Sequence, residues 1–326
     1  MSSDIDIIVT LSSPLITDEL LPQLHQEGGT IARINGSHCS PQLVRSMISD
    51  VRSIMGKSMQ IMIDMPGRKI RTKDLEDPIK LESGKEFQLY PHQFNYNKFF
   101  DALQPGQRIS ANDGMFFFDV VKLLDDRVIF LSHNDGLLHS NKGIHTTGTE
   151  IEVPPLLDVD LELIEIAKAE DVDLLGLSFV HNAEDVKMCL GYIEGTSIRM
   201  VTKIETGAAV ANLEKILDVA ETILLDRGDL ASEIGIDKVS SAQNTIIKKA
   251  LARQRSVYLA TQFLTSMTEN QIPLIAELND IYNVVLNGVH GLQLSEETAI
   301  GKYPLDAVKM MRRIANEAVK SQSLNN

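Results

Sequence analysis

Short apolar runs recur along the chain, and each is about the length of one buried strand. They cover residues 6–11, 30–35, 60–65, 173–179, 199–205, 222–228, 257–262 and 291–295. Near-continuous hydrophobic runs of this kind are typical of parallel strands that are covered on both faces. The pattern therefore predicts eight buried parallel strands.

The segments between these runs carry a helical period. In residues 44–55 and again in 210–217, the apolar side chains fall on one helical face. Eight strands that alternate with helices favour an α/β fold of the TIM (β/α)8 barrel type over an open, doubly wound sheet.

One interval, residues 73–151, breaks this alternation. It holds the mixed or alternating segments "KEFQLYP", "GMFFFDVVKLL" and "RVIFLSH". The turn signals Asn112-Asp113-Gly114 and Asn134-Asp135-Gly136 separate them. We predict a small β-rich lid domain inserted after the third strand, with residues 1–72 and 152–326 forming the catalytic barrel.

Composition narrows the class of protein. The 326 residues carry a net charge of −14, which argues against nonspecific binding to nucleic acid or to anionic membranes. No apolar stretch reaches the roughly 18–20 residues of a membrane helix. No basic region precedes the first apolar run, so we expect no signal peptide. Cys39 and Cys189 lack metal-ligand spacing, and a cytoplasmic location is expected.

Polar residues gather where the predicted strands end. Lys203 and Glu205 lie two residues apart in one strand, so both side chains point to the same side. The same end of six strands carries Arg33, Asn35, Ser37, Asp64, Lys203, Glu205, Asp226, Arg227, Asp229, Thr261, Gln262, Ser295 and Glu296. Because barrel enzymes build their active sites at the carboxyl ends of the strands, this set predicts an active site there.

The residue types indicate the chemistry. Glu205 and Asp229 are suited to share a divalent cation such as Mg²⁺. Lys203 and Arg33 are suited to neutralise a phosphoryl group or an enolate oxygen. Gly228 leaves room for backbone N–H groups to approach a carboxylate. A metal beside cations and an anionic substrate is typical of phosphoryl transfer or enolate chemistry.

Several motifs, in this order along nearly the whole chain, resemble the pyruvate kinase family. They are "IARINGSH", "IDMPGRKIRT", "SNKGI", "VTKIET", "LLDRGDLASEIG", "LATQFLTSM" and "LSEETAIGKYPLDAV". The resemblance implies a TIM barrel with a β-barrel lid inserted after strand 3. It also implies a transferase that is a kinase of glycolysis.

The resemblance implies roles for individual residues. Lys203 would stabilise the transferring phosphoryl group and the developing enolate, and Arg33 would contact phosphate. Thr261 would lie near the apparatus that protonates the enolate. Mg²⁺ or Mn²⁺ would be bound by Glu205 and Asp229.

The remaining implied sites concern substrate, nucleotide and a monovalent cation. Substrate contacts fall on Gly228, Asp229 and Ser295. Nucleotide contacts fall on Asn35, His38, Arg71 and Lys142, the last carried on the lid. The monovalent-cation site matches Asn35, Ser37 and Asp64.

The chain also departs from the family pattern. Lys69 stands where potassium-dependent members have Glu, so K⁺ is not expected to be required. Asp226 replaces the Ala before Arg-Gly-Asp, Thr206 replaces an Asn, and Glu296 replaces a Gly. Two extra acids beside an anionic site are costly unless they face away or bind a different substrate. No C-terminal regulatory domain is expected, because the chain stops after the last predicted barrel helix.

Three hypotheses follow from these features. The first is transfer of a phosphoryl group from phosphoenolpyruvate to ADP through a metal-stabilised pyruvate enolate. The second is a diverged lyase, aldolase or decarboxylase that uses the same metal–lysine site on a 2-oxo acid. The third is a catalytically weak binding or regulatory protein. No nucleic-acid or membrane partner is expected, and a homo-oligomer is compatible with all three.

Overall fold

The computed structural model describes residues 5–112, 114–147 and 152–325. The chain divides into two compact units. The barrel unit comprises Met1–Gly67 and Asp158–Asn326, and the inserted unit is Arg68–Leu157. The sequence had placed these boundaries at 72/73 and 151/152, the second of which lies outside the described residues.

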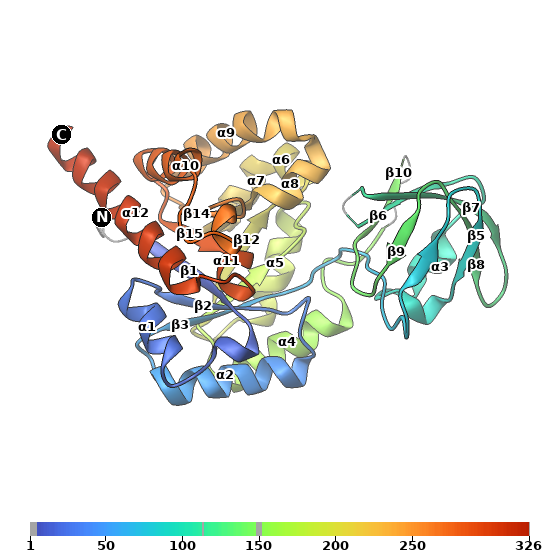
Figure 1. Cartoon of the computed structure of the whole chain (residues 1–326), viewed down its shortest axis with the longest axis horizontal. Coiled ribbons are helices and arrows are strands. Elements are labelled where there is room, and N and C mark those ends of the chain that lie inside the picture. Colours follow the sequence, from blue (N-terminus) through green and yellow to red (C-terminus); the bar gives the residue numbers. More distant parts are fainter. Residues whose placement is uncertain (1–4, 113, 148–151, 326) are drawn as a thin grey trace. The chain divides into compact units, whose positions relative to one another are not determined.

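The barrel unit contains a closed barrel of eight parallel strands, as predicted (Figure 1). Each predicted apolar run contributes one strand: β1 (Asp6–Leu11), β2 (Ile31–Asn35), β3 (Gln60–Asp64), β11 (Leu174–Leu177), β12 (Arg199–Ile204), β13 (Thr222–Asp226), β14 (Ser256–Ala260) and β15 (Gly291–Leu294). Going round the barrel, the order is β1-β15-β14-β13-β12-β11-β3-β2. The TIM-barrel fold is therefore confirmed.

Helices connect these strands. They are α1 (Leu20–Gln26), α2 (Pro41–Met55), α4 (Asp158–Ala169), α5 (Ala183–Tyr192), α6 (Gly207–Ala211), α7 (Leu213–Val219), α8 (Arg227–Ile234), α9 (Val239–Ala252), α10 (Ile275–Leu286), α11 (Glu296–Ala299) and α12 (Pro304–Asn325). Short 3₁₀ helices cover Ser13–Leu15, Ile236–Lys238 and Thr265–Thr268. Within the described ranges, no helix is both long and apolar enough to cross a membrane.

Local sequence explains the helix ends. Ser40 begins α2 as its N-cap by accepting a hydrogen bond from the Leu43 N–H at 3.2 Å, and Pro41 follows in the first turn. The helical period over 210–217 is confirmed, but Asn212 divides the segment into α6 and α7. The Asn212 side chain donates to the backbone oxygens of His181 (3.0 Å) and Ala208 (3.1 Å), which favours a turn at this point.

The inside of the barrel is layered. One cluster of buried residues consists of Ile8, Ile31, Met62, Leu174, Val201, Leu224, Tyr258 and, two residues farther along β14, Ala260. Strand side chains alternate, so the next inward positions lie two residues farther along. On five of these strands those positions are polar, namely Thr10, Arg33, Asp64, Lys203 and Asp226. An apolar floor therefore supports a polar layer at the carboxyl ends of the strands.

The inserted unit is built from antiparallel strands. A five-stranded sheet has the order β10-β6-β7-β8-β5, and β4 pairs with β9 in a second sheet. The strands are β4 (Ile79–Leu81), β5 (Glu86–Leu89), β6 (Arg108–Ala111), β7 (Phe116–Leu123), β8 (Val128–Ser132), β9 (Gly136–Leu138) and β10 (Ile144–Thr147), with α3 (Lys98–Ala102) and a 3₁₀ turn at Pro91–Gln93. Phe87, Phe118 and Phe130 pack together with ring centroids 5.0–5.3 Å apart. Asp113, in the first predicted turn, lies outside the described residues.

Gly67 ends the first part of the barrel unit in a conformation that favours glycine. Its φ is +64°, and a Cβ atom there would lie 2.5 Å from the Ser178 carbonyl oxygen. The Gly67 N–H donates to Asp160 Oδ1 at 2.9 Å, and Asp160, on α4, is fully buried. This bond ties the residue before the insertion to the helix that follows it.

Candidate active site at the carboxyl ends of the strands

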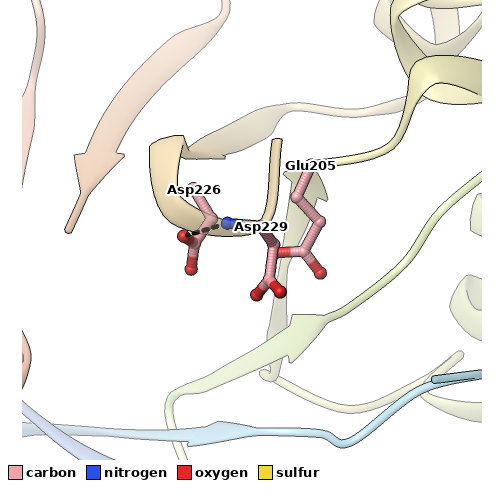
Figure 2. Close-up of side chains that lie close together, drawn as sticks. All are labelled: Glu205, Asp226 and Asp229. Carbon is pink, nitrogen blue, oxygen red and sulfur yellow. Dashed lines mark hydrogen bonds between the residues drawn. The ribbon is translucent and has the colours of Figure 1, made fainter. Parts of the chain in front are cut away.

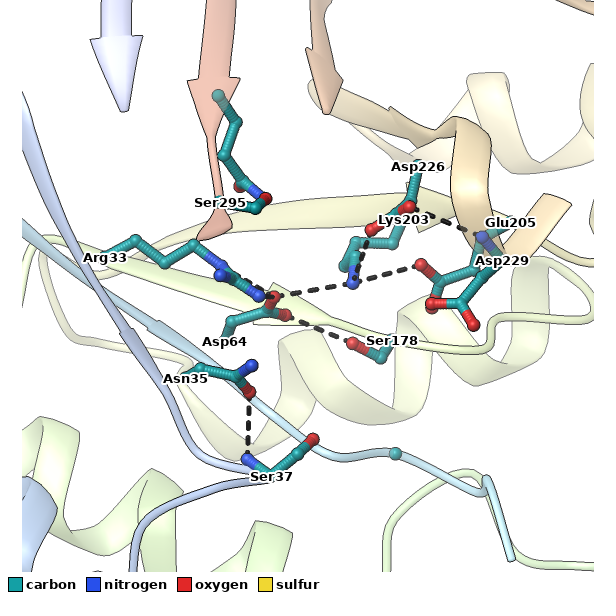
Figure 3. Close-up of polar contacts among 12 residues, drawn as sticks. Arg33, Asn35, Ser37, Asp64, Ser178, Lys203, Glu205, Asp226, Asp229 and Ser295 are labelled. Atoms are coloured by element: carbon teal, nitrogen blue, oxygen red, sulfur yellow. Dashed lines mark hydrogen bonds and ion pairs between the residues drawn. The ribbon is translucent and has the colours of Figure 1, made fainter. Parts of the chain in front are cut away.

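Lys203, near the end of β12, lies among three carboxylates (Figure 3). Its Nζ is 3.0 Å from Glu205 Oε2, 3.4 Å from Asp64 Oδ2 and 3.5 Å from Asp226 Oδ2. The side chain is buried, and burial alone would lower the pKa of Lys203. The neighbouring carboxylates outweigh burial and raise its pKa, so the ammonium group stays charged.

Arg33 on β2 is held by Asp64 at the end of β3. Its Nε and Nη2 donate to Asp64 Oδ2 at 2.9 and 2.6 Å, and its Nη1 donates to Thr10 Oγ1 at 2.8 Å. Burial acts to raise the pKa of Asp64, but Lys203 and Arg33 hold it below its usual range. Gly176 on β11 makes room, because a Cβ there would lie 2.8 Å from Asp64 Oδ1.

Asp64 was predicted as part of a monovalent-cation site. In the structure its carboxylate is bonded to Arg33, Lys203 and the Ser178 hydroxyl, which donates at 3.1 Å, and the cation role stays a prediction. Both Asp64 oxygens are therefore engaged within the protein. Ser178, which sequence analysis did not single out, follows β11 at a strand end like the other site residues.

Glu205, Asp226 and Asp229 form an acidic cluster beside Lys203 (Figure 2). One carboxylate oxygen from each lies within 4.8 Å of the others. Glu205 is fully buried, and its Oε1 accepts a hydrogen bond from the Phe179 N–H at 2.8 Å. Its Oε2 is close to Lys203 but receives no hydrogen bond of acceptable geometry. Burial raises the pKa of Glu205 to about 8, and Lys203 opposes the shift.

The donor set of this cluster fits a hard divalent cation. Carboxylate oxygens are the ligands that Mg²⁺ and Mn²⁺ prefer. When Asp64 is counted with the cluster, the site contains four acidic side chains but two cationic ones, Arg33 and Lys203. A bound cation would offset this excess of acidic groups. The buried Glu205 Oε2 is ion-paired with Lys203 Nζ at 3.0 Å but accepts no hydrogen bond, so it keeps a lone pair for a metal ion.

The sequence left open whether Asp226 faces away from the site. In the structure, its side chain faces into the site. Its Oδ1 accepts from the N–H groups of Gly228 (3.2 Å) and Asp229 (3.5 Å), so it is the N-cap of α8. Its Oδ2 faces Lys203. Strand parity could have placed it, because Asp226 lies two residues after the inward-facing Leu224.

Thr261 follows β14 in a strained conformation. Its φ is 67°, which is rare for a β-branched residue, and Gln262 has a φ of 59°. The Thr261 Oγ1 accepts from the Gly228 N–H at 2.9 Å and lies 3.3 Å from Asp226 Oδ1. Arg227 braces the turn, since its Nη2 donates to the Thr261 carbonyl oxygen at 2.5 Å. Thr261 is thus brought to the start of α8, and its role in protonating the enolate stays a prediction.

The other substitutions near the site have structural explanations. Thr206 is buried and caps α6, accepting from the Ala209 N–H at 3.0 Å and donating to the Val180 carbonyl oxygen at 2.7 Å. Glu296 is exposed, so this extra acid lies in water. Thr206 could have been predicted as a cap, because threonine is favoured at the N-cap and an alanine-rich stretch follows it after one glycine.

Ser295 and Asn35 lie at other strand ends. The Ser295 N–H donates to Glu297 Oε2 at 2.7 Å, and the Ser295 Oγ accepts from Gln293 at 3.3 Å. Glu297 is buried, and burial raises its pKa. The Asn35 side chain accepts from the Ser37 N–H at 3.0 Å. The predicted pair of Asn35 and Ser37 is brought together, but its link to a cation or nucleotide stays a prediction.

The remaining predicted residues are more scattered. His38 is exposed after β2, and Lys69, Arg71 and Lys142 belong to the inserted unit. In that unit, Arg71 forms an isolated antiparallel β-bridge with Gly143, and the Lys142 backbone N–H donates to Thr72 Oγ1 at 2.9 Å. Arg71 and Lys142 therefore lie on paired segments of one unit, and their nucleotide role stays a prediction.

Comparison with known proteins agrees with this geometry. A family model described as pyruvate kinase, barrel domain, matches residues 3–308. A pyruvate kinase of Borreliella burgdorferi is 33% identical over 98% of this chain and 69% of its own length. The pyruvate kinase of Thermococcus litoralis is 34% identical over 95% and 68%, and that of Thermotoga maritima 33% over 96% and 71%. The chain therefore belongs to the pyruvate kinase family of phosphotransferase enzymes.

Proposed function

We propose that this protein transfers the phosphoryl group of phosphoenolpyruvate to ADP through the enolate of pyruvate. The observation that carries the proposal is Lys203, a buried ammonium group surrounded by carboxylates in the polar layer of the barrel. Such a fixed cation in a site of low dielectric constant stabilises negative charge that develops during a reaction.

The chain's own residues have distinct tasks in this proposal. Lys203 faces the enolate oxygen and the transferring phosphoryl group. Arg33, locked by Asp64 and Thr10, offers a second fixed cation for phosphate. Thr261 presents its hydroxyl at the start of α8, where it helps to deliver a proton to the enolate carbon. The burial of Lys203 and Glu205 keeps water from weakening these charges.

Glu205 and Asp229 would hold Mg²⁺ or Mn²⁺, with Asp226 beside them. A bound divalent cation supplies Lewis-acid polarisation of substrate oxygens. Members of the family generally use such an ion together with K⁺. We propose that K⁺ is dispensable here, on the sole ground that Lys69 stands where potassium-dependent members have glutamate. A cytoplasmic location, expected from the cysteines, stays a prediction.

A second candidate is supported by Asp226. This acid adds negative charge beside Lys203, at a position where an anionic substrate must bind. A diverged lyase, aldolase or decarboxylase acting on a 2-oxo acid needs the same metal and lysine but no ADP. The third hypothesis, a weak binding protein, is less well supported, because the buried Lys203 cluster costs stability that a passive scaffold does not require.

The deciding experiment is a coupled assay for pyruvate with phosphoenolpyruvate, ADP and Mg²⁺, with and without K⁺. ADP-dependent pyruvate formation without K⁺ is expected. The lyase hypothesis instead predicts no ADP-dependent turnover but metal-dependent exchange of the pyruvate methyl protons with deuterated water. If both activities are absent, the enzyme proposals are wrong.

A further inference from the structure

The start of α8 already holds a carboxylate, which belongs to the protein itself. Asp226 Oδ1 takes the N–H groups of Gly228 and Asp229, at 3.2 and 3.5 Å. Its other oxygen is 3.5 Å from Lys203 Nζ. The same side chain also lies within the acidic cluster that can hold a metal (Figure 2).

These are the contacts that an incoming carboxylate would need. N–H groups at the first turn of a helix have no partner within the helix and favour anions. Lys203 Nζ, which the proposed function assigns to the ligand, lies 3.5 Å from Asp226 Oδ2. A 2-oxo acid that turns its carboxylate toward Lys203 would therefore meet Asp226 and the two N–H groups that Asp226 occupies.

Two carboxylates cannot use these donors together. The Gly228 N–H is further shared with Thr261 Oγ1 at 2.9 Å, so it has no capacity for a third acceptor. Like charges within a few ångströms also repel strongly when both are buried. A ligand carboxylate must therefore displace Asp226 or bind elsewhere.

We propose that Asp226 is a specificity-determining residue that competes with the carboxylate of 2-oxo acid ligands for the start of α8. The proposal rests on the proposed function, since it assumes that ligands of this class enter the site. It predicts weak binding of such ligands to the natural chain and tighter binding once the Asp226 carboxylate is removed.

The test is titration of pyruvate into the full chain in the presence of Mg²⁺, followed by the NMR shifts of the Gly228 and Asp229 amides. Asp226→Ala should bind pyruvate about tenfold more tightly than the natural chain, the value of about one charge-assisted hydrogen bond. Asp226→Asn should gain much less, because its side-chain oxygen still caps the same N–H groups. Glu296→Gln, which removes an exposed acid at a neighbouring strand end, should change nothing.

Two results would overturn the proposal. One is pyruvate binding to Asp226→Ala that is no tighter than to the natural chain. The other is a gain in pyruvate affinity in both Asp226→Asn and Glu296→Gln that equals the gain in Asp226→Ala. That result would mean that only the net charge of the protein matters. If loss of the N-cap prevents folding of the alanine variant, Asp226→Gly replaces it, because glycine is tolerated at N-caps.

Failure of this proposal can be distinguished from failure of the proposed function. The titration contains no ADP and requires no turnover. Absence of ADP-dependent activity in both the natural chain and Asp226→Ala would refute the kinase function without affecting the binding result. Kinase activity with unchanged pyruvate affinity in Asp226→Ala would refute only the role of Asp226.

Discussion

Buried polar groups are hydrogen-bonded differently at the two ends of the barrel strands. At the amino ends, the Tyr258 hydroxyl donates to Asp6 at 2.8 Å, and the Thr30 hydroxyl donates to the other Asp6 oxygen at 3.0 Å. At the carboxyl ends, Glu205 Oε2 and Gln293 Oε1 are buried without a hydrogen bond. These two acceptor oxygens at the carboxyl ends keep capacity for a ligand, whereas near the amino ends a buried group without a hydrogen bond is a donor, Arg52 Nε.

The balance of cationic and acidic side chains also differs between the two ends of the strands. Near the amino ends, Arg52 pairs with Asp173 at 2.6 Å, and Asp173 also accepts from the Ile61 N–H at 2.8 Å. One cation there meets one carboxylate. Around Lys203, carboxylates outnumber cations, and a φ of 67° at Thr261 adds local strain. The barrel thus concentrates stabilising contacts at one end and reactive, strained groups at the other.

The strongest test of this contrast is Lys203→Met. Activity should fall about 10³-fold, because the site loses its fixed cation. In Mg²⁺-free buffer the free energy of unfolding should fall by about 3 kcal/mol, because the buried carboxyl groups of Asp64, Glu205 and Asp226 lose their partner. Steady-state kinetics and urea unfolding provide the two measurements.

The matched control for that variant is Lys57→Met, whose exposed pair with Asp171 lies near the amino ends of the strands. Neither activity nor stability should change much, because solvent screens this pair. Equal effects of the two lysine variants would mean that the two ends do not differ as described.

Removing a carboxylate from the acidic cluster should weaken metal binding. Glu205→Gln is expected to lower Mn²⁺ affinity about 100-fold, as measured by electron paramagnetic resonance of the free ion. Glu296→Gln serves as the control and should bind Mn²⁺ like the natural chain. Undiminished affinity in Glu205→Gln would show that the cluster is not the metal site.

The raised pKa of Glu205 gives a pH dependence with a defined sign. A carboxyl group with a folded-state pKa of about 8 and an ordinary value of 4.5 is protonated at neutral pH in the metal-free protein. Its contribution to stability is full below pH 4.5 and is lost as the pH rises through about 8. Without metal, thermal unfolding should therefore occur at a lower temperature at pH 9 than at pH 6.

The same proton must leave when a metal binds. Mg²⁺ affinity should rise about tenfold per pH unit between roughly pH 6 and 8 and then level off, as measured by calorimetry in two buffers with different ionisation enthalpies. An affinity that stays constant across this range would contradict the assignment of the proton to Glu205.

The smallest expected effect lies at the amino ends. Tyr258→Phe removes the hydrogen bond to Asp6 and should lower the free energy of unfolding by about 1 kcal/mol. Activity should remain unchanged at a temperature where both proteins are folded. A loss of turnover comparable to that of a carboxyl-end variant would break the separation between the two ends.

The sequence predicted the barrel well because its strands are buried on both faces. Runs such as residues 7–9 and 223–225 have no polar interruption, so the strand pattern is clear without tertiary information. Asn212 shows the limit of such patterns. Its neighbours keep a helical period, but its side chain also donates to the His181 carbonyl oxygen of another segment at the break between α6 and α7, and this bond depends on the fold.

The candidate site was predictable in its charges but not in its pairing. Lys203 lies in β12 and Glu205 directly follows its last residue, so their common direction follows from strand parity. The bond between Arg33 and Asp64 joins two strands, and its geometry depends on how β2 and β3 align. The cap that Asp226 forms on α8 similarly requires the position of the helix relative to the strand end.

The hydrogen bond between Gly67 and Asp160 has a consequence for protein engineering. It holds the two points where the barrel unit is interrupted close together in space, although 92 residues separate Gly67 from Asp160 in the chain. Segments whose ends nearly meet can be excised and replaced by a short flexible linker with little effect on the host domain. Joining Gly67 to Asp158 in this way should yield a minimal barrel that retains the Lys203 cluster in a chain about a quarter shorter.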